Sequence, residues 1–134
     1  MGSENQKLKK KFWKVFSEYS RRKNADWQGY ATCCSCGVTK KWQELDAGHY
    51  HPRTDGLSTF FEDKNVHAQC RGCNSFRHGN LARYAIFLIG KYGQGILEEL
   101  EWKSRQTISI SNEEYKRLIF EYKNKIKELD ETEK

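Results

Sequence analysis

The sequence lacks any stretch that could cross a membrane. A membrane-spanning helix needs roughly 18 or more predominantly apolar residues in succession, and the 134 residues contain no such run. The amino-terminal residues also lack the apolar segment of a secretory signal peptide. No internal repeat is present, and the length suits one modest core with helical extensions. These absences predict a soluble protein of one domain, with no membrane partner.

Cysteines are few, but they are clustered. An odd, clustered set in a chain without a secretory signal favours metal binding over disulfides. Cys33 and Cys36 form one Cys-x-x-Cys pair, and Cys70 and Cys73 form a second. Two such pairs supply the four soft ligands of a tetrahedral zinc ion. Cys34 could replace Cys33, but only the spacing of 33 with 36 repeats that of 70 with 73, so we interpret Cys34 as a buried or spare thiol.

The predicted zinc ion is structural rather than catalytic, because four thiolates leave no open coordination position for water. The 33 residues between the two pairs leave room for a β-hairpin. We expect strands at 42–50 and 60–67, joined by the turn-prone segment 52–56, and then a short helix at 73–78. Any chemistry must therefore come from other residues of this clamped segment, and a nuclease here would need a second metal ion.

Helical patterns surround this segment. Apolar residues recur at helical spacing over residues 4–23, with lysines in the other positions. Asn80 is a candidate N-cap, and Ser111 with Glu114 forms a capping box. These signals predict further helices at 81–92, 96–103 and 112–129. The expected fold is therefore α+β, in three regions: a basic amphipathic helix at 1–24, a zinc-stapled core with its following helix at 25–93, and a carboxy-terminal helical extension at 94–134.

The charge balance is moderately basic. The chain has 24 Lys plus Arg against 18 Asp plus Glu, a formal net charge of +6. Such a bias attracts polyanions without proving that they bind. Lys10 and Lys14 lie on the basic face of the helix at 4–23, which either contacts a DNA backbone or is a solvated surface.

Several residues of the clamped segment fit a nuclease motif. His49 lies three residues before Pro52, Asn65 lies nine before Asn74, and Asn74 follows Cys73 directly. This pattern resembles the HNH, or ββα-metal, endonuclease superfamily. The resemblance implies an HNH-like core in which His49 is the general base that activates water. It also implies that Asn65 pins the hairpin loop through backbone hydrogen bonds and that Asn74 holds a catalytic Mg²⁺ or Mn²⁺ ion.

The second ligand of this catalytic ion is open. Many HNH enzymes have an aspartate directly before the base, where this chain has Gly48. Asp46 projects from the same strand face as position 48, and the missing side chain could leave space for its carboxylate. His78 is a rival because it lies one helical turn after Asn74, and His67 is another. Each of these side chains could instead be structural, with Asp46 capping a turn or pairing with a lysine.

A closer resemblance rests on three strings: Asp-Ala-Gly-His-Tyr at 46–50, Asn-Val-His-Ala-Gln-Cys-x-x-Cys-Asn at 65–74 and Gly-Asn-Leu at 79–81. Together they resemble the lambdoid phage NinG family, also called Rap, over roughly residues 25–130. The resemblance implies a recombination protein that cuts branched DNA, including Holliday junctions and D-loops, in the cytoplasm of the host cell. Other recombination proteins are then candidate partners.

The residues that would contact DNA, the oligomeric state and two rival functions complete the prediction. Side chains suited to clamping phosphates are Arg53, Arg71, Arg77, Lys10 and Lys14. A four-way junction is two-fold symmetric, so paired cuts favour a homodimer. The helices at 4–23 and 112–129 offer apolar stripes for that interface, unless one of them closes the core. The rival functions are a non-catalytic zinc module that binds DNA in recombination and an HNH nuclease without preference for branches.

Overall fold

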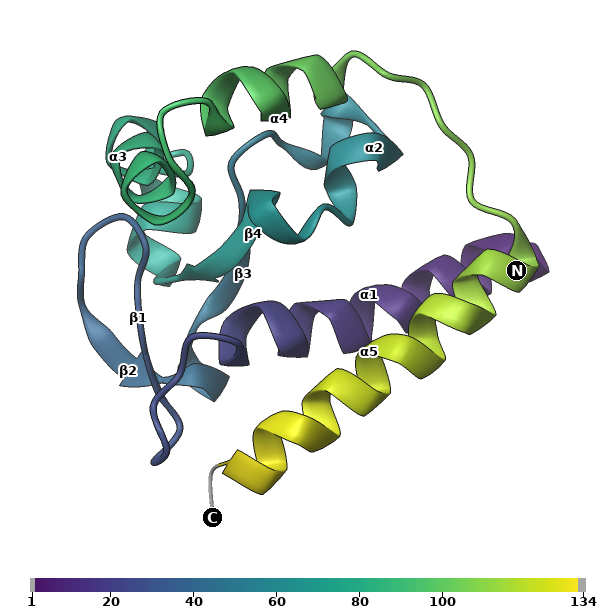
Figure 1. Cartoon of the computed structure of the whole chain (residues 1–134), viewed down its shortest axis with the longest axis horizontal. Coiled ribbons are helices and arrows are strands. Elements are labelled where there is room, and N and C mark those ends of the chain that lie inside the picture. Colours follow the sequence, from purple (N-terminus) through teal and green to yellow (C-terminus); the bar gives the residue numbers. More distant parts are fainter. Residues whose placement is uncertain (1, 133–134) are drawn as a thin grey trace.

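Two long helices lie side by side along one edge of the molecule in the computed structural model, which describes residues 2–132 (Figure 1). They are α1 (Glu4–Arg22) and α5 (Asn112–Thr132). The helix predicted at 4–23 is confirmed, and Ser3 and Gln6 cap its start reciprocally. The predicted capping box at Ser111 is half formed: its Oγ accepts the backbone amide of Glu114 at 3.1 Å, but the Glu114 carboxylate accepts from the Ser111 hydroxyl, at 3.3 Å, and not from the Ser111 backbone amide. The α5 helix extends three residues beyond the expected end.

The helices α1 and α5 run in the same direction. Asn5 donates to Asn112 near their starts, at 2.9 Å, and Arg22 donates to Asp130 near their ends, at 2.5 Å. Aromatic side chains fill the space between them and the sheet: Phe12, Phe16, Phe61, Tyr115 and Tyr122. The apolar stripes of both helices are therefore used inside the chain. A homodimer stays a prediction, and it would need other surfaces.

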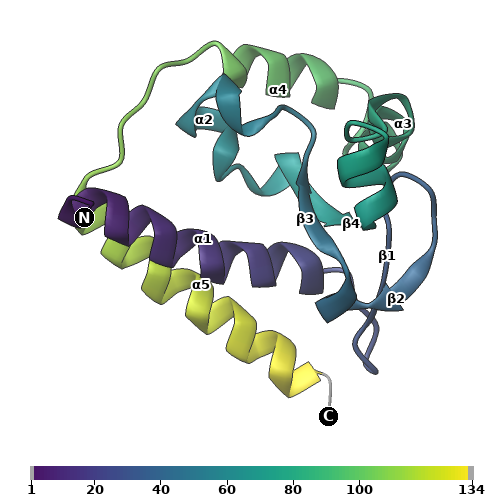
Figure 2. The ribbon, with the colours of Figure 1, turned by 180° about the vertical axis from the view of Figure 1, so that it is seen from behind.

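Two small antiparallel sheets follow α1. One pairs β1 (Tyr30–Thr32) with β2 (Thr39–Lys41), and the other pairs β3 (Asp46–His49) with β4 (Val66–Gln69). In Figure 2, the β3–β4 sheet lies between α1 on one side and α3 on the other. The register sets His49 opposite Val66. The predicted antiparallel hairpin is thus confirmed as a pairing, within a mixed α and β fold.

The expected strand bounds, 42–50 and 60–67, were wrong. Residues 42–44 form a 3₁₀ turn, and Phe60 ends the one-turn helix α2 (Leu57–Phe60). Both Phe60 and its neighbour Phe61 contact Trp13, with ring centroids 5.4 and 6.4 Å away. Consecutive strand residues point to opposite faces, so an extended strand could not place both rings against α1.

The space at Gly48 is filled by Gln69 and not, as expected, by Asp46. A Cβ at position 48 would collide with the Gln69 side chain. That side chain is buried, and its Nε2 is held by two hydrogen bonds, to Ser35 Oγ at 3.0 Å and to the Gly79 carbonyl at 2.6 Å. Gln69 therefore ties the first cysteine loop to the turn that follows the second, across the face of β3.

Replacing Gly48 with alanine is expected to destabilise the protein by about 1–3 kcal/mol, because the fixed Gln69 side chain cannot move aside. Urea unfolding of the zinc-loaded protein would measure this loss. Gly90→Ala is the matched control: an added Cβ there meets nothing within 4 Å, and alanine in a helix is favoured over glycine by about 0.5–1 kcal/mol. Equal stabilities of the Gly48 variant and the wild type would contradict this packing.

Helices α3 (Leu81–Tyr92) and α4 (Ile96–Ser104) cover the other face of the sheet and confirm the helices predicted at 81–92 and 96–103. Tyr84, Leu88 and Leu100 are fully buried there. Asn80 does precede α3, but its side chain makes no cap. Its backbone is left-handed, with φ 44°, and its Nδ2 donates to Cys73 Sγ at 3.4 Å.

The helix expected at 73–78 is a single π-helical turn, Gly72–Phe76, which ends before His78 because that residue has a positive φ of 49°. No helix within residues 2–132 combines the length and the apolar character that crossing a bilayer requires. The core joins all three predicted regions, since Phe12, Val66 and Tyr115 belong to one buried cluster. The division at 24 and 93 stays a prediction.

Candidate functional site

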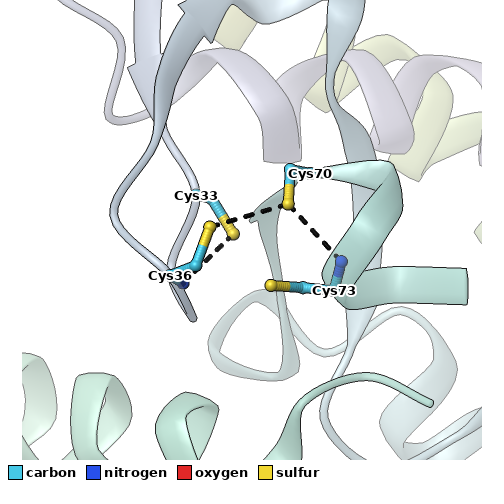
Figure 3. A group of neighbouring side chains, drawn as sticks. All are labelled: Cys33, Cys36, Cys70 and Cys73. Carbon is cyan, nitrogen blue, oxygen red and sulfur yellow. Dashed lines mark hydrogen bonds between the residues drawn. The ribbon is translucent and has the colours of Figure 1, made fainter. Parts of the chain in front are cut away.

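The four cysteines of the two predicted pairs converge on one point. Cys33 and Cys36 lie in the loop between β1 and β2, while Cys70 follows β4 and Cys73 lies in the π turn. Their sulfur atoms all lie within 4.8 Å of one another (Figure 3). The Sγ atoms of Cys36 and Cys70 are 3.7 Å apart. A tetrahedral zinc ion with Zn–S bonds of about 2.3 Å would hold sulfurs about 3.8 Å apart.

The surroundings favour the thiolate at Cys33, whereas burial raises the pKa of the Cys70 thiol to about 12. The backbone amide of Ser35 points at Cys33 Sγ, at 3.4 Å, and that of Cys73 points at Cys70 Sγ at the same distance. Burial opposes ionisation of Cys33, but backbone hydrogen bonds, first among them that of Cys36, outweigh it and lower the pKa of this thiol to about 7. The donor set and its geometry therefore fit a metal ion such as zinc, with no position left open for water.

Cys34 lies outside this group, as the spacing predicted. Its thiol is buried beside Ser35 and Tyr84, and burial raises its pKa to about 12. Cys34 is therefore a packed thiol, and its backbone amide donates to the Ala68 carbonyl at 3.0 Å, which joins the first cysteine loop to β4.

His49 lies at the end of β3 with its ring held by two neighbours, Trp13 and Phe60. It stacks on Trp13, with centroids 5.3 Å apart and planes 23° apart, and it meets the edge of Phe60. Its Nε2 lies 2.9 Å from the Phe60 carbonyl oxygen. Because a carbonyl can only accept, Nε2 carries the proton of the neutral ring and Nδ1 is left with a free lone pair. Burial, aided by the nearby Arg53 cation, lowers the pKa of His49 to about 4.

Asn65 ties the segment after β3 to the segment before β4. Its Oδ1 accepts the backbone amide of His51 at 2.8 Å, and its Nδ2 donates to the carbonyls of His51 and Thr59, at 3.0 and 2.9 Å. The side chain is fully buried. Asn65 thus fixes the loop that carries the residues after His49, which is the kind of contact that the motif implied.

Asp46 and Asn74 meet although 27 residues separate them in the sequence. Asn74 Nδ2 donates to Asp46 Oδ2 at 3.1 Å, and Arg71 approaches the other carboxylate oxygen at 3.7 Å. Asn74 also lines a pocket of about 320 Å³ together with His49, Arg53 and His78. Carboxylate and amide oxygens are ligands that hard divalent ions prefer, so the two side chains are chemically suited to hold Mg²⁺ or Mn²⁺.

The remaining histidines differ sharply in their surroundings. His67 is buried, with Nδ1 3.0 Å from the Tyr84 hydroxyl and Nε2 2.8 Å from the Tyr92 hydroxyl. Both ring nitrogens are thus engaged, which removes His67 as a metal ligand in this arrangement. His51 pairs with Asp55 at 3.0 Å. His78 is exposed and lines the pocket beside Asn74, so it keeps its place as a candidate.

The buried His67 should make stability depend on pH. Burial, together with the Lys23 and Lys91 cations, lowers its pKa to about 2, against about 6.5 in an unfolded chain. Below pH 6.5 the unfolded chain therefore binds a proton that the folded chain does not, so the stabilisation is complete above pH 6.5 and declines as the pH falls. Between pH 7 and pH 5 we expect the wild type to lose about 2 kcal/mol more than His67→Gln, measured by urea unfolding. Equal losses would contradict this assignment.

The side chains predicted to bind phosphates lie in different parts of the structure. Arg53 lies at the pocket, with its guanidinium 4.7 Å from the Trp13 ring. Arg71 and Arg77 are exposed on either side of the π turn. Lys10 and Lys14 lie on the outer face of α1. Of these five cations, only Arg53 lines the pocket beside His49 and Asn74.

Sequence reasoning missed two residues that hold the site. Trp13 of α1 stacks on His49, and Gln69 fills the space beside Gly48. The helical pattern of α1 showed Trp13 only as an aromatic outside the apolar stripe. Gln69 ends the strand directly before a cysteine, and this polar residue in that position was the signal that could have predicted a buried hydrogen-bonding role.

Comparisons with known proteins agree with the strings at 46–50, 65–74 and 79–81. The family model described as "Bacteriophage Lambda NinG protein" matches residues 3–133. Protein ninG of Escherichia phage lambda is 38% identical over 100 residues, which cover 72% of this chain and 47% of that protein. Protein ninG of Salmonella phage P22 is 35% identical over 97 residues, with the same two shares. The chain spans about half the length of the curated relatives it matches, and no solved structure matches it.

Proposed function

Because this chain belongs to the NinG family of bacteriophage proteins, we propose that it is a metal-dependent endonuclease that cuts branched DNA, such as Holliday junctions and D-loops. One observation carries the proposal. His49, whose Nδ1 is unprotonated, and Asn74, which is bonded to Asp46, line the same pocket. A base and a set of oxygen ligands beside one pocket are what hydrolysis of a phosphodiester requires.

Each residue has a distinct role in this proposal. Nδ1 of His49 takes the proton from the attacking water, and the low pKa keeps the ring neutral at physiological pH. Asp46 and Asn74 offer oxygens to a divalent ion, with His78 as a rival ligand at the pocket wall. When bound, such an ion supplies charge stabilisation at the scissile phosphate and at the departing 3′ oxygen. Arg53, at the pocket, is placed to neutralise a neighbouring phosphate.

The cysteine group supports this chemistry indirectly. It joins the loop between β1 and β2 to the π turn that carries Asn74, while β3 carries Asp46 and His49. The HNH-like arrangement proposed here therefore depends on the metal-linked cysteines for the position of Asn74 relative to His49. Four thiolates cannot supply the catalytic ion itself, so a second ion is part of the proposal.

A cleavage assay tests the function. Zinc-loaded protein is incubated with an end-labelled four-way junction, or with a linear duplex of the same sequence, in Mg²⁺ or Mn²⁺. We expect the junction to be cut faster than the duplex and neither to be cut without the added ion. Equal cutting of both substrates would indicate a nuclease without preference for branches. Binding without any cutting would indicate a non-catalytic zinc module.

A further inference from the structure

A basic groove lies on the outer face of α1, away from the cysteines. Five cations, Lys7, Lys10, Lys11, Lys14 and Arg21, line it together with Trp13 and Ser17, and no carboxylate does. The spacing of three and four residues places these side chains along one face of the helix. The face from residue 7 to residue 21 is about 21 Å long at 1.5 Å per residue.

The lysines of this groove form no ion pair with described residues, although Glu18 lies near Lys11 and Lys14 on the adjoining side of the helix. Within the part of the chain that the structure describes, the ion pairs of α1 are at its ends, where Glu4 meets Lys116 and Arg22 meets Glu18 and Asp130. None of the four groove lysines takes part in them. Like charges four residues apart on a helix repel each other. A polyanion that binds along this face would relieve that repulsion.

Trp13 connects the groove with the pocket. Its indole lines the groove and also stacks on His49, at 5.3 Å. The guanidinium of Arg53 lies over the same indole, 4.7 Å from the ring. Both His49 and Arg53 line the pocket beside Asn74. Trp13 therefore links the two hollows by contact, since it lines the groove and lies against two residues that line the pocket.

We infer that the α1 groove binds the sugar–phosphate backbone of the DNA strand that leads into the pocket. The partner is DNA rather than a small anion because the charges are spread along the helix. One DNA strand carries a phosphate about every 3.4 Å, so the groove spans about six of them. The inference rests on the proposed function only in taking DNA as the polyanion.

Salt-dependent binding tests the groove. Fluorescence anisotropy with a labelled four-way junction, in zinc but without Mg²⁺ or Mn²⁺, gives the affinity from about 50 to 200 mM KCl. Each phosphate contact contributes about 0.9 to the slope of log affinity against log salt. Lys10→Gln combined with Lys14→Gln should therefore reduce the slope by about 1.8 and weaken binding on the order of 60-fold at 0.1 M salt. Arginine at both positions should restore the slope.

The matched control removes two exposed lysines from α5, with Lys116→Gln combined with Lys127→Gln. It changes the net charge equally and should leave the slope unchanged. A similar slope change in both double variants, or none in either, would overturn the inference. The result is separable from the nuclease proposal. If the variants change the salt dependence of binding as expected but the wild type cuts no DNA, the groove inference holds and the nuclease proposal fails. If the wild type cuts junctions but Lys10→Gln with Lys14→Gln leaves the salt dependence unchanged, only the groove inference fails.

Discussion

Cys73→Ser is expected to lose bound zinc and the cooperative unfolding of the core. Cys73 is fully buried, and its sulfur is one of four that lie within 4.8 Å of one another. A structural zinc site contributes about 10–16 kcal/mol of apparent binding energy in small domains, which is comparable with the whole stability of a domain, about 5–15 kcal/mol. Elemental analysis should find one zinc per wild-type chain and less than about a tenth of that in the variant.

Cys34→Ala provides the control for this loss. Cys34 is also buried and is the neighbour of Cys33, but its sulfur lies outside the group of four. It should keep one zinc per chain and a single thermal transition. The aromatic core between α1 and α5 contains no cysteine, so residual helical signal in Cys73→Ser is expected. A full equivalent of zinc and an unchanged melting temperature in Cys73→Ser would contradict the assignment.

His49→Gln is expected to reduce the rate of junction cleavage about 10²–10⁴-fold, the range that a general base contributes. Glutamine can still donate a hydrogen bond to the Phe60 carbonyl that His49 Nε2 contacts at 2.9 Å. It has no basic nitrogen to take the place of Nδ1. The hydrogen bond to Phe60 can therefore be kept, while the proton acceptor and the ring stacked on Trp13 are both removed. Single-turnover cleavage at saturating protein separates this loss from binding, which should stay within about twofold of the wild type.

His51→Gln is the matched control for the cleavage experiment. His51 follows two residues later, in the segment after β3, and its ring faces Asp55 at 3.0 Å. Its contact with Asn65 uses the backbone amide, which the substitution retains. The rate should therefore stay close to that of the wild type. Equal rates for wild type and His49→Gln would remove His49 from the reaction.

The cysteine group and the helices could be predicted from the sequence because both are local patterns. Two Cys-x-x-Cys pairs identify four ligands by spacing alone, and the periodicity of residues 4–23 and 81–92 identifies amphipathic helices. Strand bounds were poorer, because Phe60 ends a one-turn helix and Phe61 follows it, an arrangement that packs both rings on Trp13 of α1. That preference arises from tertiary packing and leaves no mark in the local sequence.

The candidate site was likewise predicted only in part from the sequence. The motif placed His49, Asn65 and Asn74 in one segment, but it could not choose between Asp46, His67 and His78 as the second ligand. That choice depends on which side chains meet. The structure engages both nitrogens of His67 with tyrosines and bonds Asp46 to Asn74. The stacking of Trp13 on His49 joins residues 36 positions apart in the sequence, so no motif spacing could predict it.

The central claim is that the metal-linked cysteines hold Asp46 and Asn74, the proposed ligands of a divalent ion, beside the base His49. Anomalous scattering from a zinc-loaded crystal soaked in Mn²⁺ would test this claim most directly. We expect zinc at the four sulfurs of Cys33, Cys36, Cys70 and Cys73, and manganese bonded to oxygens of Asp46 and Asn74 near His49. Manganese bound elsewhere, or absent from this pocket while zinc is in place, would contradict the proposed catalytic site.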